Sequence, residues 1–341
     1  MTLRIGMVAY STHQGLGYLA KSFYDAGVID DVLVVPHRAY PNHPEWYGEY
    51  ATIVNPRSIR GTEVDRVLSS VDTMLFFETP FDWSFPERCH SHGVKTVCIP
   101  MYEWFPKNRL STFSGYLCPS RLDVDYFCEY RHTPFVPPVD PASWSLRTRA
   151  VKFLHNSGHI GHRNHKGTEE LLQSLQYLET DLVVTVRSQS SKTFNNFLQK
   201  MPWLKDNRHL DLQLGEVPYK EMFSGHDVYV APEKFNGLSL PLQESYSSGL
   251  LVMASDRYPT NTWLPTEPLI PVKSYYKAAI ADQYISFDEA QIDPKSIASK
   301  MDQWYGQDIT AFSYAGREWA KVNSWNNKRD TFFRLMEGLC E

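Results

Sequence analysis

The sequence predicts an α/β protein built from two doubly wound halves, and three observations support this fold class. Short apolar runs of strand length alternate with helical stretches, a pattern typical of parallel sheets covered by helices. This alternation occurs twice, on either side of a proline-rich segment at 132–144 that cannot hold a helix. The chain of 341 residues is also long enough to bury two cores of ordinary size.

The expected elements follow from these runs in chain order. The first half is expected to hold strands at 4–9, 32–36, 73–77, 96–100 and 116–119, with helices near 15–26, 62–70, 85–92 and 121–130. The second half is expected to hold strands at 151–155, 182–187, 210–214, 228–231 and 250–254, with helices near 167–178, 191–201, 218–224 and 241–248. We expect an interdomain linker at 132–144 and helices after about residue 285. Doubly wound sheets bind ligands beyond the carboxyl ends of their strands, so candidate residues are sought there.

The composition disfavours several classes of protein. The longest apolar runs have only strand length, and the amino terminus enters a strand without a signal-peptide pattern. The number of cysteines, five, is odd and they form no C-x-x-C pair, which fits a reducing compartment and predicts a cytoplasmic protein. The net charge of −5 argues against a broad nucleic-acid-binding surface. A local group of His and Arg among aromatic residues at 37–60 is either a solvated connection or a docking site for an anionic or ring-containing ligand.

The segment 229–256, YVAPEKFNGLSLPLQESYSSGLLVMASD, is the most informative part of the chain. A buried strand runs into a turn that contains Pro232, Asn236, Gly237 and Ser239, and a helix starts near Pro241. Small residues at the carboxyl end of a strand let backbone N–H groups approach an anion, and the positive amino end of the following helix favours its binding. This order of residues therefore predicts an anion site.

The same segment resembles the donor-sugar segment of GT-B glycosyltransferases related to glycosyl transferases group 1 (family 4), which reads P-x-x-x-E-G-x-G-L-P-x-x-E. Gly237, Leu240, Pro241 and Glu244 match in register, whereas the uncharged Asn236 stands where the family has its first glutamate, and Ser239 stands where it has glycine. The resemblance implies two Rossmann-like domains that face a deep cleft. It assigns 1–140 to acceptor binding, 141–315 to donor binding, and 316–341 to a helix that packs back on the first domain.

The resemblance also implies a set of donor-binding residues. The pair Lys166-Gly167 matches the family's K-G pair at the nucleotide diphosphate, and Arg163 matches its arginine with a shorter spacing. Glu244 would accept hydrogen bonds from the ribose, and the backbone of Val217 would read the base. The full set is Gly15, Gly17, Arg163, Lys166, Val217, Asn236, Gly237, Leu238, Ser239 and Glu244. Charge on the leaving group would be stabilised by Lys166, Arg163 and the N–H groups of Leu238 and Ser239.

Candidates for acceptor binding follow strands of the first half. The loop with Gly15 and Gly17 after the first strand allows close approach of a ligand, although an ordinary strand-to-helix turn would need glycine as well. Glu103 stands near the place where many family members have a histidine, so it is either a base that accepts the acceptor's proton or a partner in a cap or salt bridge. The expected acceptor-binding residues are His13, Arg38, Glu78 and Glu103, and the expected catalytic residues are Glu103, Lys166 and Asn236.

A metal site is not expected, although two patterns could suggest one. His155, His159, His162 and His165 lie close in sequence, but glycines between them argue against a helix, and no carboxylate or cysteine is near. Asp123-Val124-Asp125 spells a D-x-D pattern, but it lies in the first turn of an expected helix, where acids favour the helix dipole. The resemblance implies a transferase that needs no metal or other cofactor.

The resulting hypothesis is a retaining, metal-independent glycosyltransferase that moves a sugar from a nucleotide-diphosphate sugar to an acceptor hydroxyl. Two alternatives keep the fold: a sugar-nucleotide epimerase, or a catalytically degenerate binding subunit, which the uncharged Asn236 would explain. The acceptor could be a glycan, a small molecule or a hydroxymethylated DNA base. The sequence leaves the nucleotide, the acceptor and the oligomeric state open.

Overall fold

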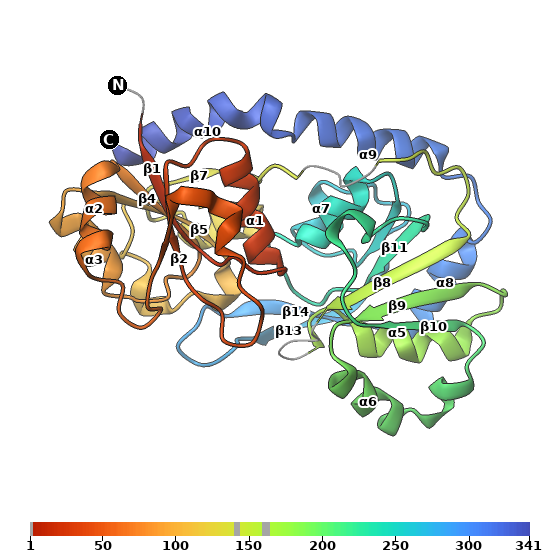
Figure 1. Ribbon diagram of the computed structural model, residues 1–341. Helices are drawn as coiled ribbons and strands as arrows, with labels where there is room; N and C mark the ends of the chain where they lie inside the picture. The colour runs from red at the N-terminus through yellow and green to blue at the C-terminus, as the bar shows by residue number, and fades with distance from the viewer. Residues whose placement is uncertain (1–2, 140–143, 159–163) are drawn as a thin grey trace. The chain divides into compact units, whose positions relative to one another are not determined.

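The computed structural model describes residues 3–139, 144–158 and 164–341, which form two compact units (Figure 1). Unit 1 comprises Met1–Pro138, Ala281–Ile285 and Asn323–Glu341, and unit 2 comprises Val139–Ile280 and Ser286–Val322. Each unit has its own sheet. Among the described residues, no helix is both long and apolar enough to cross a lipid bilayer.

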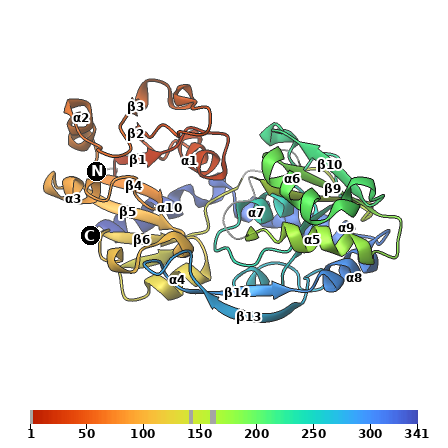
Figure 2. The same cartoon turned by 90° about the horizontal axis from the view of Figure 1, so that it is seen from below.

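Unit 1 contains a parallel sheet with seven described strands. They are β1 (Ile5–Ala9), β2 (Asp31–Val34), β3 (Ala51–Ile53), β4 (Thr73–Glu78), β5 (Lys95–Pro100), β6 (Gly115–Cys118) and β7 (His132–Pro134). Their order across the sheet is β3-β2-β1-β4-β5-β6-β7, and β1, β4, β5 and β6 can be followed side by side in Figure 2. The central strands are buried along almost their whole length, because helices cover both faces of the sheet.

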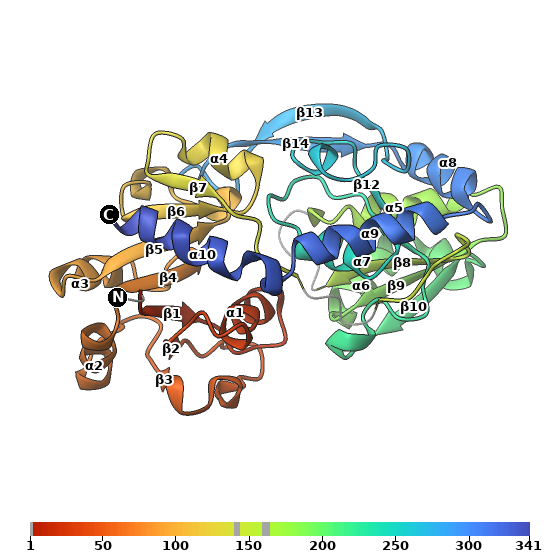
Figure 3. The ribbon, with the colours of Figure 1, turned by 90° about the horizontal axis from the view of Figure 1, so that it is seen from above.

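The helices of unit 1 are α1 (Gly15–Asp25), α2 (Thr62–Ser70), α3 (Phe85–Ser91), α4 (Arg121–Phe127) and α10 (Trp325–Cys340), with short 3-10 turns η1 (Pro44–Tyr50), η2 (Tyr102–Trp104) and η3 (Lys107–Arg109). The last helix, α10, crosses β5, β6 and β7, as Figure 3 shows. Its Trp325 and Phe332 pack edge-on against Phe23 of α1, with ring centroids 4.7 and 5.4 Å apart. The carboxyl-terminal helix thus belongs to the core of unit 1, as the fold class predicts.

Unit 2 contains a second parallel sheet, formed by β8 (Lys152–Gly158), β9 (Val183–Ser188), β10 (Leu210–Leu214), β11 (Val228–Ala231) and β12 (Leu251–Ala254) in the order β10-β9-β8-β11-β12. An antiparallel pair, β13 (Val272–Ala278) and β14 (Phe287–Ile292), follows. The helices are α5 (Thr168–Ser174), α6 (Ser191–Lys200), α7 (Leu240–Ser247), α8 (Pro294–Trp304) and α9 (Thr310–Val322), with 3-10 turns η5 (Leu175–Tyr177), η6 (Pro202–Asp206), η7 (Tyr219–Glu221) and η8 (Thr260–Thr262).

Strand order identifies the place in each unit where a ligand is expected. In unit 1 the order reverses between β1 and β4, and in unit 2 it reverses between β8 and β11. Connections leave these neighbouring strands toward opposite faces of the sheet, which opens a crevice beyond their carboxyl ends. The loops after β1, β4, β8 and β11 are therefore the natural positions for functional side chains.

The expected parallel strands and most helices are confirmed to within a few residues, but four expectations need correction. Residues 132–134 of the expected linker form β7, because an edge strand tolerates the nearby prolines. The expected helix at 218–224 is only η7, and the chain forms β14 after residue 285 before its last helices begin. The strands β3 and β13 were not predicted, because much of their surface is exposed and they lack a continuous apolar run.

Candidate functional site

Gly167 brings the two loops at the strand reversal of unit 2 together. It has φ of 67° and precedes α5, while Pro232 follows β11. A Cβ atom at Gly167 would lie 1.9 Å from the Pro232 carbonyl oxygen, which is shorter than any van der Waals contact. Only glycine accommodates both the left-handed backbone and this close approach. The predicted K-G pair therefore has a structural reason for its glycine.

The adjacent Lys166 forms a buried ionic cluster with Glu233 and Arg257. Its Nζ atom lies 2.6 Å from Glu233 Oε1, and Arg257 Nη2 lies 3.6 Å from Glu233 Oε2. Glu233 is 1% exposed and Arg257 is 2% exposed, whereas the Lys166 side chain keeps 16% exposure. Burial opposes ionisation of Glu233, but the two cations outweigh it and lower its pKa below the ordinary value. The cluster thus holds an ionised carboxylate that orients the more accessible Lys166.

Arg257 also fixes the loop that leads into α7. Its Nε donates to the Glu233 carbonyl and its Nη1 to the Asn236 carbonyl, both at 3.0 Å. Asn236 Oδ1 accepts the Ser239 N–H at 2.9 Å, so the amide caps the turn within its own loop. Ser239 has φ of 40°, a left-handed conformation that glycine usually adopts. In this arrangement the Ser239 N–H, predicted to face a diphosphate, is already engaged by Asn236.

Glu244 lies on α7 with only 8% of its surface exposed. Tyr219 of η7 donates its hydroxyl to Glu244 Oε1 at 2.8 Å, which connects the turn after β10, containing Val217, with α7. Burial raises the pKa of Glu244 to about 7, although the Tyr219 hydrogen bond and the nearby Lys166 charge oppose the shift. The carboxyl is therefore poised to change its protonation near neutral pH.

The structure brings together most of the predicted donor residues that it describes. Lys166, Asn236, Ser239 and Glu244, with the intervening Gly237 and Leu238, lie on the loops and helix around the strand reversal of unit 2. Arg163 lies outside the described residues. Sequence reasoning missed Glu233, Tyr219 and Arg257. Glu233 could have been found, because it is a charged residue directly after the proline that follows a buried strand. Arg257 could not, because it contacts a loop that lies more than twenty residues earlier in the sequence.

His155 has a structural role that leaves it uncharged. The ring is 1% exposed, its Nδ1 lies 2.8 Å from the Val230 carbonyl oxygen, and its Nε2 lies 2.8 Å from Thr168 Oγ1. The carbonyl can only accept, so Nδ1–H donates to it and the threonine hydroxyl donates to Nε2. Burial lowers the pKa of His155 to about 4. Of the other histidines in that stretch, His159 and His162 lie outside the described residues; within the described part, no group of three or more potential ligands could hold a metal ion.

Three acidic residues follow neighbouring strands of unit 1. Glu78 ends β4 with φ of 63°, Glu103 lies in η2 after β5, and Asp123 lies in α4 after β6. Burial, with a smaller contribution from the Glu103 charge, raises the pKa of Glu78 to about 7 and that of Asp123 to about 8. Like charges at adjacent strand ends disfavour one another's ionisation. This edge of unit 1 therefore holds carboxyl groups able to exchange protons near neutral pH.

Asp123 takes part in the cap of α4, as the capping interpretation of the D-x-D pattern predicts. Its N–H donates to Ser120 Oγ at 3.2 Å, and its carboxylate accepts from the Ser120 hydroxyl and from the Tyr102 N–H. Asp123 is fully buried, while Asp125 is exposed. The two acids do not share one environment.

The loop after β1 carries the other predicted residues of unit 1. A Cβ atom at Gly17 would lie 2.1 Å from the Thr12 carbonyl oxygen, so glycine is required where α1 begins. The exposed His13 shares a 2.5 Å hydrogen bond with the Tyr18 hydroxyl, and its ring centroid lies 5.1 Å from that of Trp46. Arg38 is exposed in the segment after β2. The aromatic-rich stretch thus supplies a partly exposed group of rings around His13.

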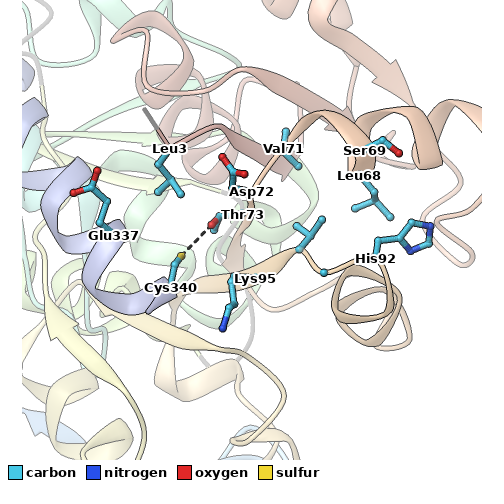
Figure 4. Close-up of a pocket in the computed structure, with 12 residues that line it drawn as sticks. Leu3, Leu68, Ser69, Val71, Asp72, Thr73, His92, Lys95, Glu337 and Cys340 are labelled. Atoms are coloured by element: carbon cyan, nitrogen blue, oxygen red, sulfur yellow. Dashed lines mark hydrogen bonds between the residues drawn. The ribbon is translucent and has the colours of Figure 1, made fainter. Parts of the chain in front are cut away.

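A hollow of about 550 Å³ lies at the opposite edge of the unit 1 sheet (Figure 4). Thr73 and Lys95, the first residues of β4 and β5, line it together with Cys340 of α10, whose Sγ lies 2.9 Å from Thr73 Oγ1. It lies at the amino ends of the strands, whereas ligands of doubly wound sheets bind at the carboxyl ends. Volume alone therefore does not identify the functional site here.

Comparison with known proteins gives a clear result for structure and none for sequence. No protein-family model matches the chain, and no curated protein matches it. A glycosyltransferase from Rickettsia africae is similar over 99% of both chains, with 13% identity and a TM-score of 0.69. HepE of Anabaena, solved in complex with UDP and glucose, covers 98% of this chain and 99% of its own, with 10% identity and a TM-score of 0.72. A sucrose-phosphate synthase from Thermosynechococcus elongatus covers 99% of both, with 12% identity and a TM-score of 0.70.

These solved structures cover 98 to 99% of this chain. At identities this low, the structural likeness establishes only the arrangement of the backbone, and the substrates must be argued from the side chains. The predicted fold is confirmed: the chain has the fold of the GT-B glycosyltransferases.

Proposed function

We propose that the protein is a glycosyltransferase that uses a nucleotide-diphosphate sugar. The observation that carries this proposal is Lys166, a partly accessible cation at the strand reversal of unit 2, held there by the buried Glu233. The amino end of α7 adds the positive end of a helix dipole beside the same loop. The whole-chain likeness to glycosyltransferases, one of them solved with UDP and glucose, supports the same chemistry.

In this proposal unit 2 binds the donor. Lys166 would pair with the diphosphate and stabilise the charge that develops as the bond from the sugar's anomeric carbon to the phosphate oxygen breaks. Glu244 would accept hydrogen bonds from the ribose hydroxyls, and the turn that contains Val217 would read the base, since Tyr219 connects this turn with Glu244. The identity of the nucleotide depends on backbone contacts, which the side chains do not reveal.

Unit 1 would bind the acceptor in the same proposal. The exposed His13 and the rings around it offer a surface for a ring-containing acceptor. As the acceptor oxygen bonds to the anomeric carbon, its proton would pass to Glu103 or to Glu78, whose pKa of about 7 suits a base near neutrality. Retention of configuration and independence of metal ions are part of the proposal and rest on the resemblance of the 229–256 segment to family 4.

The test combines a screen of nucleotide sugars with variants of unit 2. We expect one donor to raise the melting temperature, and Lys166→Ala and Glu244→Ala to reduce transfer at least tenfold while the protein stays folded. Lys234→Ala is the matched control, since Lys234 has a similar 15% side-chain exposure and its own 2.6 Å ion pair with Glu170. Unchanged turnover in both site variants would refute the assignment.

The same screen separates the alternatives. Incubation of the donor without acceptor, followed by analysis of the sugar, would reveal an isomerised product if the protein is an epimerase. Binding of nucleotide sugars without transfer, hydrolysis or isomerisation would indicate a degenerate binding subunit. The structure gives the uncharged Asn236 a role in capping its own loop, which is compatible with an active transferase.

A further inference from the structure

The buried cluster in unit 2 pairs Glu233 unequally with its two cations. Glu233 Oε1 lies 2.6 Å from Lys166 Nζ, but Glu233 Oε2 and Arg257 Nη2 stand 3.6 Å apart. Both of these latter atoms are fully buried and make no well-formed hydrogen bond, although the nearby Ser239 side chain also helps to lower the pKa of Glu233. Two complementary charged groups thus face each other in the protein interior with the bond between them unmade.

Such an arrangement is unfavourable on its own. A buried charged atom without a hydrogen bond retains its desolvation cost, and a shift of about 0.7 Å would bring the pair to the usual charge-assisted distance. Arg257 is not free to make this movement, because its Nε and Nη1 already donate to the Glu233 and Asn236 carbonyls. The Glu233 carboxylate, whose Oε1 accepts from Lys166 Nζ at 2.6 Å, is therefore the partner that would have to move.

We propose that Glu233 is a positioning residue shared between Lys166 and Arg257, and that it transfers its pairing to Arg257 when a diphosphate recruits Lys166. This inference rests on the proposed function. In the unliganded protein Glu233 orients the lysine. When the diphosphate draws the Lys166 ammonium away, Glu233 closes the gap to Arg257 and remains paired.

The reason for such a transfer is the cost of an unpaired buried carboxylate. Removal of one partner from a buried ion pair is strongly destabilising, because it leaves the other charge without compensation. If a diphosphate paired with Lys166 and nothing replaced the lysine beside Glu233, the cost of the unpaired carboxylate would weaken diphosphate binding. With Arg257 in place the cost is avoided, so Arg257 determines how tightly a diphosphate binds although it is 2% exposed and need not touch the ligand.

The inference can be tested by a double-mutant cycle. The probes are UDP, GDP, ADP and dTDP, each compared with its nucleoside, measured by calorimetry and by ligand-observed NMR for the weak nucleosides. We expect Arg257→Met to weaken the best diphosphate about tenfold or more, with the affinity for the nucleoside within about twofold of wild type. Glu233→Gln should bind the diphosphate at least as tightly as wild type, since no carboxylate competes for Lys166. The double variant should bind the diphosphate clearly more tightly than Arg257→Met, because no buried carboxylate remains to lose its partner, although the loop bonds of Arg257 are lost in both variants.

The matched control is Arg147→Met. Arg147 is also a partly buried arginine of unit 2 that donates to backbone carbonyls, those of His226 and Ser145, at a distance from this loop in the sequence. It should leave the ratio of diphosphate to nucleoside affinity unchanged. If Arg257→Met fails to fold, Arg257→Lys and Glu233→Gln remain informative, and a tenfold loss of diphosphate affinity in Glu233→Gln overturns the inference.

Two results of the double-mutant cycle would also overturn the inference about Glu233. One is an Arg257→Met variant with the wild-type ratio of diphosphate to nucleoside affinity. The other is a double variant as weak as Arg257→Met. Failure of the proposed function has a different signature, since the wild-type protein would then bind none of the four diphosphates, and this inference would fall with it.

Discussion

Gly167 shows how a single residue can decide whether the site forms. Its φ is 67°, and a Cβ atom added there would lie 1.9 Å from the Pro232 carbonyl oxygen, so no side chain fits unless the loop after β11 moves. We expect Gly167→Ala to lower the free energy of unfolding by about 2 to 4 kcal/mol and to abolish detectable nucleotide binding. The control is Gly158→Ala, since Gly158 has a similar φ of 59° but open space around its Cβ, and should cost only about 1 kcal/mol. Equal effects of the two substitutions in urea unfolding would contradict the close-contact argument.

Glu244 predicts a pH dependence of nucleotide binding. Burial places its pKa at about 7 in the unliganded protein, whereas ribose hydroxyls donate best to the ionised carboxylate. Binding should therefore tighten as the pH rises through 7, level off above pH 8, and release a proton near neutrality. Calorimetry in buffers of different ionisation enthalpy measures that proton. Glu244→Gln should bind more weakly and without this pH dependence, and a wild-type affinity that is flat from pH 6 to 8 would argue against the ribose contact.

Single residues also show which part of the site the sequence could predict. Lys166, Gly167 and Glu244 follow from local order, because a glycine loop, a cation and a helix are close in sequence. Glu233 and Arg257 form their cluster with Lys166 across three separate segments, and only the packing of β8, β11 and β12 brings them together. A sequence pattern cannot predict this contact, because it depends on how the three segments pack in space. Asn236, which stands out as a departure from the motif, is explained only by its bond to the Ser239 N–H.

At the scale of elements, apolar runs identified the buried strands because both faces of each are covered. The edge strands β3 and β7 of unit 1 and the pair β13–β14 were not predicted, because their side chains mix polar and apolar types. The start of α4 was well predicted, and Ser120 caps it, whereas the start of α8 after its cap Asp293 was not predicted. The helix α10 was also expected from the sequence, although no side chain caps its start, and its packing on unit 1 came only from the resemblance to the fold family.

The packing of α10 predicts a specific stability pattern. Phe332 is fully buried against Phe23 and Phe135, whereas its neighbour Phe333 is partly exposed. We expect Phe332→Ala to lower the free energy of unfolding of unit 1 by about 3 to 5 kcal/mol, because it leaves a cavity in an aromatic cluster. Phe333→Ala should cost clearly less. Similar losses for both, measured by denaturant unfolding, would mean that α10 does not contribute to the core as described.

The raised pKa of Glu78, the last residue of β4, predicts how the stability of the protein changes with pH. The pKa of Glu78 is about 7 in the folded protein against an ordinary value of 4.5, so the folded state holds a proton that the unfolded chain has released. Stability should therefore fall as the pH rises from about 5 to 8. Glu78→Gln removes the unfavourable charge and should stabilise the protein by about 1 to 3 kcal/mol at pH 8, with little effect at pH 5. A uniform effect at both pH values would show that the Glu78 charge is not the cause.

At the scale of the whole molecule, the two sheets divide the proposed reaction between them. Cations and a helix amino end are gathered at the strand reversal of unit 2, whereas carboxyl groups are gathered at the strand ends of unit 1. A diphosphate requires positive charge, and an acceptor hydroxyl requires a group that takes its proton. The charges of the two units are thus suited to different substrates, although no single segment of the sequence reveals this division.

This division predicts that donor binding and transfer can be separated by mutation. Glu103→Gln in unit 1 keeps the size of the side chain but cannot accept a proton, so it should lower the transfer rate at least a hundredfold while nucleotide affinity stays within about twofold of wild type. Lys166→Ala in unit 2 should lower both the transfer rate and the nucleotide affinity. Hydrolysis of the donor by water requires no bound acceptor, so Glu103→Gln should retain more of its slow hydrolysis than of its transfer. If Glu103→Gln instead weakens nucleotide binding as strongly as Lys166→Ala does, then Glu103 contacts the donor, and the acceptor role within unit 1 belongs to the residues around His13.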